Sequence, residues 1–166
     1  MANALFNERT DKLRHRILSP LTFRLFMWKQ LPLAGFAGLH LRSLDEGGCT
    51  VILPGGWRTQ NPFQSTYFAA QAMAAEMSTG APALILVQGN DAKISLLVTD
   101  VRARYTKKVA GESQFTFREV GEMAETIERA GKTGEPATYL AKSVGRNAAG
   151  DIASEFEILW SFKRRD

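Results

Sequence analysis

Residues 61–77 form an alanine-rich stretch in which a single side chain, that of Glu76, is charged. A stretch of this length without a polar face predicts a helix that is buried on all sides. An unpartnered carboxylate is unfavourable in such a place, so Glu76 needs a structural or a functional explanation. The rest of the chain must supply enough secondary structure to cover a helix of this kind.

The expected bounds of this helix come from its flanking residues. Asn61 can cap the free backbone amides at a helix start, and Pro62 is tolerated at the first helical position. Gly80 and Pro82 are typical of a helix end. We therefore expect a long central helix over about 62–79.

Most of the remaining chain has the alternation of apolar and polar residues that predicts strands. We expect a largely antiparallel sheet of about six strands, and seven stretches have strand character: 36–42, 49–53, 83–87, 93–108, 114–118, 137–144 and 152–162. The alternation changes phase near Leu96 and Leu97, which predicts a bulge or a bend there. The simplest arrangement is an α+β fold in which the sheet curls around the central helix.

Further helices are expected before the first strand and after the strand at 114–118. An N-terminal helical segment covers about 7–31, and a further helix covers 120–130 with Gly131 as its cap. The many apolar side chains of residues 21–30 must cover either the sheet or a partner. No repeat, low-complexity tract or linker divides the sequence, so we expect residues 1–166 to form one domain.

Composition argues against several classes of function. The net charge of +4 attracts polyanions in general. The basic residues are not interleaved with aromatic ones, however, so no nucleic-acid partner is expected. His15 and His40 are far apart and Cys49 is the single cysteine, so neither a metal site nor an internal disulfide is expected. No nucleotide-binding glycine motif is present, and no cofactor is expected.

The sequence also gives an expectation about location. Its richest apolar run, residues 21–36, is interrupted by charges and by proline, so no membrane span is expected. No signal peptide is recognisable, and one cysteine is compatible with a reducing compartment. We therefore expect a cytoplasmic protein.

One stretch points to a known family. Residues 53–61, Leu-Pro-Gly-Gly-Trp-Arg-Thr-Gln-Asn, run into the Glu76 helix in a way that resembles the loop-and-helix signature of hotdog-fold acyl-CoA thioesterases. The resemblance is to a branch of unknown function that is related to the phenylacetyl-CoA and 4-hydroxybenzoyl-CoA thioesterases. The turn with Gly150 and the strand with Trp160 resemble the same branch. The resemblance covers the chain from about Pro20 to its end.

This resemblance implies a fold, a substrate and an assembly. The hotdog fold is a curved antiparallel sheet wrapped around a central helix. The substrate would be an acyl-CoA or a similar acyl thioester, in which coenzyme A is part of the substrate and not a separate cofactor. The assembly would be a homodimer, or a tetramer built from it, with sites between subunits.

The resemblance also implies site residues. In those thioesterases an Asn or Gln precedes the helix and an Asp or Glu follows fifteen positions later, which is the spacing of Asn61 and Glu76. Glu76 would be the general base or the nucleophile, and Asn61 would position water or substrate. Backbone amides near Tyr67 and Phe68 would receive the carbonyl oxygen of the thioester.

The chain departs from the family pattern at the helix start. The family commonly has His-Gly-Gly where this chain has Tyr67-Phe68-Ala69, so Phe68 stands where a glycine would admit the carbonyl. This departure favours an alternative function. The chain would then be a non-catalytic hotdog module that binds an acyl or lipid ligand, or a protein partner.

Helical spacing adds possible substrate-lining residues. Ser65, Ala69, Ala72 and Glu76 would share one helix face, and these small side chains would leave a slot for an acyl chain or a pantetheine arm. Alternatively, the small residues let the sheet pack closely and Glu76 reaches solvent or an arginine at an interface. Asn61 is explained equally well as a helix cap. Ser65 and Thr66 carry hydroxyls near the helix start but lack a nucleophile elbow, so they are expected to line the site.

Basic residues on one predicted strand are candidates for binding the coenzyme A phosphates. Arg102, Arg104 and Lys108 share a strand face if the alternation holds. The alternative is an ordinary solvated strand face.

Overall fold

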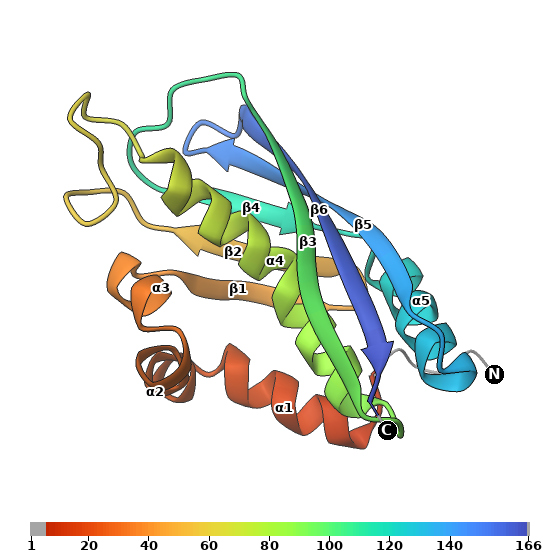
Figure 1. Ribbon diagram of the computed structural model, residues 1–166. Coiled ribbons are helices and arrows are strands. Elements are labelled where there is room, and N and C mark those ends of the chain that lie inside the picture. Colours follow the sequence, from red (N-terminus) through yellow and green to blue (C-terminus); the bar gives the residue numbers. More distant parts are fainter. Residues whose placement is uncertain (1–5, 166) are drawn as a thin grey trace.

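The computed structural model describes residues 6–165, and its centre is one six-stranded sheet (Figure 1). The strands lie in the order β1-β2-β4-β5-β6-β3, and every neighbouring pair is antiparallel. Their bounds are β1 His40–Asp45, β2 Gly48–Leu53, β3 Ile94–Tyr105, β4 Ser113–Phe117, β5 Ala137–Asn147 and β6 Ile152–Arg164. The predicted α+β architecture with about six strands is confirmed.

Five helices accompany the sheet within residues 6–165: α1 Glu8–Leu18, α2 Pro20–Gln30, α3 Pro32–Ala37, α4 Phe68–Gly89 and α5 Val120–Thr133. The long α4 is the central helix, and it contacts β2, β3, β4, β5 and β6. The sheet curves around it, as Figure 1 shows. Helices α1 to α3 lie beside the β1 edge of the molecule, and α5 lies near the other end of the sheet, against β5 and β6.

The core lies between α4 and the concave face of the sheet. Four phenylalanines of the strands are fully buried there, namely Phe115, Phe117, Phe156 and Phe162. The helix supplies mostly small side chains to this interface, including Ala74, Ala75 and Ala83. Small residues let the helix approach the sheet closely, which is why a helix without a polar face is stable in this position.

The central helix does not have the bounds expected from the sequence. It begins at Phe68, six residues after Pro62, and it continues to Gly89 instead of ending at 79. The Asn61 side chain does not cap it, because Asn61 Oδ1 accepts hydrogen bonds from the backbone N–H groups of Phe63 and Ser65. Residues 61–65 therefore form a tight loop before the helix.

The predicted strand at 83–87 is also wrong, since these residues form the second half of α4. Pro82 lies inside the helix and lacks the N–H that would donate to the carbonyl of Ser78. Burial of Ala83, Ile85 and Leu86 against the rest of the core outweighs this missing bond.

The β1–β2 hairpin and the irregularity in β3 match the expectation. In the hairpin, His40 pairs with Ile52 and Asp45 with Gly48. In β3, the pairing with β6 shifts between Val98 and Asp100, which is two residues beyond the predicted position. This shift leaves Thr99 without a pairing partner on β6. The apolar residues before Thr99 and those after it therefore lie on the same inner face of the sheet.

Two other predicted boundaries are corrected. Residues 32–37 form α3, so strand β1 starts at His40 and not at Phe36. Helix α5 continues past Gly131 to Thr133 and ends at Gly134, whose φ of 78° suits a glycine. Gly131 is instead a packing position, because a Cβ there would lie 2.8 Å from Asn90 Oδ1.

The N-terminal segment is helical, as expected, but it contains three helices and extends to Ala37. Within residues 6–165, no helix is both long enough and apolar enough to span a membrane.

Candidate active site

Glu76 carries the single charge on α4, and it lies in the third turn of the helix. Its side chain is half-buried, and this burial raises the pKa of the carboxyl group above its ordinary value of 4.5. No hydrogen bond or ion pair joins the carboxylate to any other residue within 6–165. Because no partner holds the carboxylate, it can accept a proton from a bound molecule. Because its pKa is raised, it does so at a higher pH than an ordinary glutamate does.

The space beside the carboxylate is bordered by Gly80 and Trp160. A Cβ at Gly80 would lie 2.9 Å from Glu76 Oε1 and 3.3 Å from two atoms of the Trp160 ring. The absence of a side chain at Gly80 therefore leaves room for the carboxylate in its present position. The indole ring of Trp160, on β6, forms a wall of the same space.

A short chain of hydrogen bonds fixes this wall. Trp160 Nε1 donates to Thr79 Oγ1 at 3.0 Å, and Thr79 Oγ1 donates to the backbone carbonyl of Glu76 at 2.9 Å. Both side chains are buried. The strand residue Trp160 is thus connected through Thr79 to the helical turn that carries the acid.

The face of α4 around Glu76 is the face that the sheet covers least. Ala69, Ala72 and Glu76 are all half-buried, whereas Ala70, Ala74 and Ala75 on the opposite side are buried. The predicted strip of small side chains therefore exists on the helix from Ala69 to Glu76. Ser65 does not belong to it, because it lies in the loop before α4.

The start of α4 presents two free backbone donors. Tyr67 is the N-cap residue, and its side chain makes no capping hydrogen bond. Its backbone N–H donates to the carbonyl of Thr59 at 2.7 Å, so this amide is already occupied. The N–H groups of Phe68 and Ala69 have no hydrogen-bond partner among the described residues. They lie at the positive end of the helix dipole, where partial negative charge is favoured.

Aromatic rings surround these donors. The ring centroids of Tyr67 and Phe68 are 4.8 Å apart, and those of Phe68 and Tyr105 are 6.3 Å apart. The Tyr105 hydroxyl donates to the backbone carbonyl of Phe68 at 3.4 Å, and burial raises the pKa of Tyr105. Tyr67 and Phe68 remain 47% and 55% exposed, so the rings narrow the approach to the helix start without closing it.

Asn61 organises the loop before the helix. Its Oδ1 accepts hydrogen bonds from the Ser65 backbone N–H at 3.2 Å and from Ser65 Oγ at 3.1 Å. Its side-chain amide nitrogen has no partner among residues 6–165, so Asn61 can still donate a hydrogen bond. Thr66 is buried, and its backbone N–H donates to the carbonyl of Val109 at 2.7 Å.

The structure does not bring Asn61 and Glu76 together within one chain. Glu76 lies eight positions after Phe68 on the helix, which corresponds to about 12 Å along its axis. Asn61 lies beyond the helix start, on the far side from Glu76. The amides of the helix start and the carboxylate are therefore too far apart to act on one carbonyl group from the same subunit.

One polar residue of this region was not found from the sequence. Gln71 is 5% exposed, and its Nε2 donates to the carbonyl of Thr66 at 3.4 Å. Its Oε1 is buried without a hydrogen-bond partner. The sequence does show Gln71 as a polar residue within the apolar stretch. The direction of its side chain could not be predicted, because that direction depends on the helix start at Phe68.

The basic candidates separate into two places. Arg102 and Arg104 lie on β3, opposite Glu157 and Glu155 of β6, and with Lys142 they border a cavity of about 490 Å³. Lys108 lies beyond the end of β3, and its Nζ donates to the carbonyl of Phe63 at 2.8 Å. The expected common strand face of all three residues is therefore not present.

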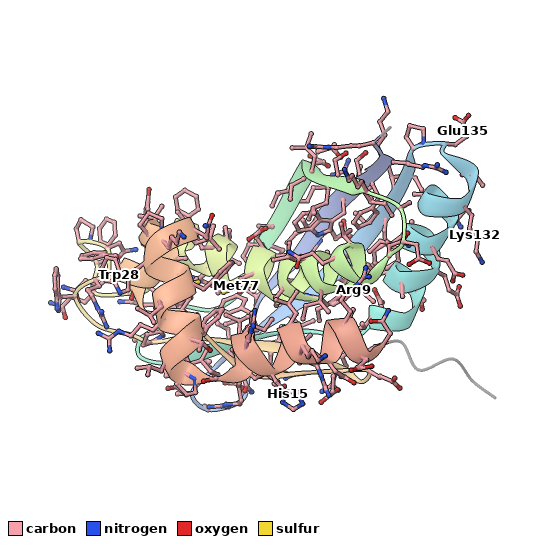
Figure 2. All side chains as sticks on the ribbon, turned by 90° about the horizontal axis from the view of Figure 1, so that it is seen from below. Arg9, His15, Trp28, Met77, Lys132 and Glu135 are labelled. Atoms are coloured by element: carbon pink, nitrogen blue, oxygen red, sulfur yellow. The ribbon has the colours of Figure 1, made fainter. Side chains whose placement is uncertain are left out.

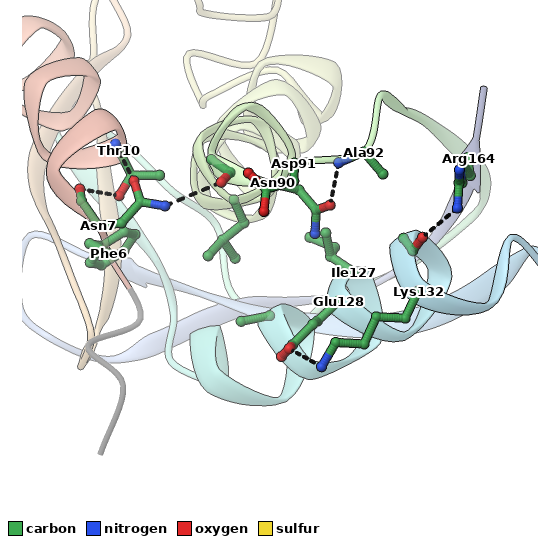
Figure 3. Close-up of a pocket in the computed structure, with 14 residues that line it drawn as sticks. Phe6, Asn7, Thr10, Asn90, Asp91, Ala92, Ile127, Glu128, Lys132 and Arg164 are labelled. Carbon is green, nitrogen blue, oxygen red and sulfur yellow. Dashed lines mark hydrogen bonds and ion pairs between the residues drawn. The ribbon is translucent and has the colours of Figure 1, made fainter. Parts of the chain in front are cut away.

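A cavity at another place on the described chain is remote from these candidates. It measures about 910 Å³ and lies between the start of α1, the end of α4 and α5 (Figure 3). Its polar groups bond to one another, as in the ion pair of Lys132 with Glu128 and the hydrogen bond from Arg164 to the Gly131 carbonyl. Glu76 lines neither this cavity nor the cavities of about 650, 490 and 360 Å³ elsewhere within residues 6–165.

The remaining reactive residues do not form a site. Cys49 is fully buried on β2, and burial raises the pKa of its thiol. In the described part of the chain, no three His, Cys, Asp or Glu side chains gather in a way that could hold a metal ion.

Comparisons with known proteins give the fold. No family model and no curated protein sequence matches the chain. Solved structures do match, among them a protein of unknown function from Pseudomonas aeruginosa, with a TM-score of 0.73, 20% identity and coverage of 90% of this chain and 99% of that one.

Several of the matching structures are named as thioesterases, and two of them serve as examples. One, from Haemophilus influenzae, has a TM-score of 0.65 and 12% identity, and the match covers 87% of this chain and 90% of that one. The other, from Staphylococcus aureus and solved as a glutamine-to-alanine variant, has a TM-score of 0.62 and 12% identity, with coverage of 80% and 98%. The chain therefore has the hotdog fold of these proteins, as the sequence resemblance implied.

Proposed function

We propose that the protein hydrolyses an acyl thioester, with an acyl-CoA as the substrate and Glu76 as the reacting acid. The observation that carries this proposal is the state of the Glu76 carboxylate. It is the single charge on a central helix, it is half-buried with a raised pKa, and it has no partner within residues 6–165. A carboxylate that served only the structure would be expected to have a partner or to lie in solvent.

As a general base, Glu76 would take a proton from a water molecule while the water oxygen attacks the thioester carbonyl carbon. The negative charge that develops on the carbonyl oxygen would be stabilised by the free N–H groups of Phe68 and Ala69. The carbon–sulfur bond then breaks, and the leaving thiolate takes the proton from the Glu76 carboxylic acid. As a nucleophile, Glu76 would instead attack the carbonyl carbon itself, so that the carbon–sulfur bond breaks, the thiolate leaves and an acyl anhydride forms, which water then hydrolyses to the free acid and the Glu76 carboxylate.

The distance along α4 supports a site shared by two subunits. The amides at the helix start lie about 12 Å along the axis from Glu76, so they would have to act together with Glu76 of a second copy. We therefore propose a homodimer with a site at its interface. Asn61, whose side-chain amide is free to donate, would position water or substrate on the side of the helix start.

The spacing in a related protein supports the same pair of residues. The Staphylococcus aureus thioesterase has been solved both as a glutamine-to-alanine variant and as a glutamate-to-alanine variant, at positions fifteen residues apart. Asn61 and Glu76 have this spacing and this order of an amide followed by an acid.

The substrate groups can be assigned to regions of the chain. Ala69 and Ala72 on the half-buried face of α4 would line the acyl or pantetheine part, together with the rings of Tyr67 and Phe68. Arg104 on β3 has no ion pair within residues 6–165 and is the strongest candidate for a coenzyme A phosphate. Arg102 is weaker because Asp100 already binds it at 3.2 Å. We also propose a cytoplasmic location, which is supported by a single buried cysteine that has no disulfide partner.

A second candidate function is favoured by the rings at the helix start. Tyr67 and Phe68 narrow the approach to the free amides, and this arrangement fits a non-catalytic module that holds an acyl or lipid ligand. Such a module would need the apolar surface of this region but would not need the Glu76 carboxylate.

The two functions are separated by an assay of the purified protein on a panel of acyl-CoAs, with detection of the released thiol. We expect turnover that falls by about 10²- to 10⁴-fold in both Glu76→Gln and Glu76→Ala. Glu125→Gln, an exposed acid on α5, is the matched control and keeps full activity. Activity that survives both Glu76 substitutions would exclude this residue from the mechanism. A lack of turnover with acyl ligand retained through purification would support the binding module.

A further inference from the structure

Large apolar side chains are exposed together at one end of the molecule. We call this surface the apolar end and define it by Leu21, Leu25 and Trp28 of α2, Leu33 of α3, and Trp57 and Phe63 of the loop before α4. Their side chains are between 52% and 78% exposed. Single exposed apolar residues are ordinary, but a group that includes two tryptophans indicates an interaction surface.

Helix α2 shows why these side chains are exposed. Phe23 and Met27 face the protein and are buried. Leu21, Leu25 and Trp28 follow at spacings of four and three on a different side, so they form an apolar stripe that faces outward. Figure 2 shows Trp28 at the end of the molecule opposite Lys132 of α5 and Glu135, which follows that helix.

The loop before α4 contributes to the same surface. The ring centroids of Phe36 on α3 and Trp57 in the loop are 5.8 Å apart, in an edge-to-face contact. Figure 1 shows α2, α3 and this loop at the same end of the sheet. The apolar end is therefore one surface built from two segments of the chain.

The charges on this surface all have one sign. Residues 12–44 and 47–75 contain no aspartate or glutamate. Arg24, Lys29 and Arg58 lie among the apolar side chains, and none of the three forms an ion pair or a side-chain hydrogen bond with any residue of the described chain. The surface thus combines an exposed apolar area with unneutralised positive charge.

A cavity opens within the same region. It measures about 360 Å³ and lies between α2, α3 and β1. Its lining includes the apolar Phe23, Met27 and Leu41, and the cations Arg24 and Arg58. An apolar chain and an anionic group could therefore be bound side by side at this place.

We propose that the apolar end binds the surface of a bilayer that contains anionic phospholipid. Trp28, Trp57 and the leucines would enter the boundary between headgroups and acyl chains, as amphipathic surface helices do. Arg24, Lys29 and Arg58 would contact the anionic headgroups. This proposal does not rest on the function proposed above, although Phe63 of the apolar end lies in the same loop as Asn61 and donates its backbone N–H to Asn61 Oδ1.

Charge favours a membrane over a second copy of the chain as the occupant. In a two-fold interface, the apolar end would face its own copy, so that Arg24, Lys29 and Arg58 would approach the same three cations. No acidic residue in α2, α3 or residues 54–67 could neutralise them. Like charges brought together in this way disfavour an interface, whereas an anionic lipid surface neutralises them.

The test is sedimentation of the full chain with phospholipid vesicles. One set contains phosphatidylcholine alone, and the other contains equal parts of phosphatidylcholine and phosphatidylglycerol. We expect binding to the anionic vesicles that weakens as salt is added. Arg24→Glu with Arg58→Glu should weaken this binding by about tenfold or more, because each charge near such a surface contributes on the order of 1 kcal/mol. Leu25→Ser with Trp28→Ser should also weaken it, at either salt concentration.

Matched variants at the opposite end control for a general loss of charge or apolar area. Arg129→Glu with Lys132→Glu on α5, and Leu140→Ser on β5, should bind the vesicles as the unchanged protein does. Circular dichroism verifies that each variant is folded. The proposal is overturned if anionic vesicles do not bind the protein, if phosphatidylcholine alone binds it equally well, or if the α5 variants lose binding to the same extent. It is also overturned if Leu25→Ser with Trp28→Ser converts a dimer into monomers in the absence of lipid.

Discussion

At Phe68 the backbone and the side chain have opposite effects on the proposed chemistry. Its N–H is one of two free donors at the start of α4, and its ring narrows the approach to that donor. The two contributions can be separated because Phe68 is the first helical residue, where proline is well tolerated. Tyr67 has φ −61° and ψ 136°, an extended conformation that also suits a residue before proline.

We predict that Phe68→Pro lowers thioesterase activity by about 10²- to 10³-fold, since it removes one donor to the developing oxyanion. Phe68→Ala removes the same ring but keeps the N–H, so its activity should equal or exceed that of the unchanged protein. Steady-state kinetics of the two variants measure the difference. Equal activity in both variants would show that the N–H of residue 68 does not contribute to the reaction.

Glu76 gives a prediction about stability and pH. Its pKa is raised in the folded protein, so near and above its ordinary pKa of 4.5 the folded state binds more protons than the unfolded state. The contribution of Glu76 to the free energy of unfolding should therefore fall as the pH rises from about 4.5 through the raised pKa, and then stay constant. Glu76→Gln should remove this contribution.

Urea unfolding of the two proteins between pH 4 and pH 8 tests this prediction. The stability of Glu76→Gln relative to the unchanged protein should increase with pH. The contributions of other acids to the pH dependence of stability are the same in both proteins and cancel in this difference. Asp151, whose pKa is lowered by Lys107, is one of these acids. A difference that does not vary with pH would contradict the burial of the Glu76 carboxyl group.

Single residues were predicted from the sequence with unequal success. The importance of Glu76 follows from its isolation in an apolar stretch, and the importance of Asn61 from its spacing to Glu76. The roles of Trp160 and Gly80 could not be predicted in this way. They depend on which residue of β6 faces which turn of α4, and this pairing is set by the sheet and not by the local sequence.

At the scale of elements, α4 shows where local patterns are insufficient. Asn61 and Pro62 have the residue types of a helix start, but the Asn61 oxygen bonds within its own loop and the helix begins at Phe68. Pro82 and the apolar residues after it have the pattern of a helix end followed by a central strand. A helix that is apolar on all faces has no periodicity that distinguishes it from such a strand, so its second half was assigned wrongly.

The contact between α4 and β6 provides a stability prediction. Trp160 Nε1 donates to Thr79 Oγ1 in the buried core. Thr79→Val keeps the shape of the side chain but leaves the indole N–H without an acceptor, so we expect a loss of about 1–3 kcal/mol in the free energy of unfolding. Thr79→Ser retains the hydroxyl and should lose less. Urea unfolding monitored by tryptophan fluorescence gives both values, and equal losses would argue against a role for the hydrogen bond.

At the scale of the whole molecule, the separation of the helix start from Glu76 predicts complementation between subunits. Phe68→Pro and Glu76→Gln should each inactivate both sites of a homodimer. In a mixed dimer, one site has both substitutions and the other has neither. Refolding the two inactive variants together should therefore restore about a quarter of the unchanged activity, for random pairing in a two-fold dimer. If both residues acted within one chain, the mixture would stay inactive.

The order of the strands also constrains how the chain can fold during its synthesis. Strand β3, with 12 residues, is made before β4 and β5, yet its sole partner in the sheet is β6, where Tyr105 pairs with Ser154 and Ile94 with Arg164. Until residues 152–164 have left the ribosome, β3 and β5 both lack the strand that lies between them in the sheet, so their edges facing β6 are unpaired. We therefore expect slow folding that depends on the last strand, and aggregation of nascent chains that stop before it.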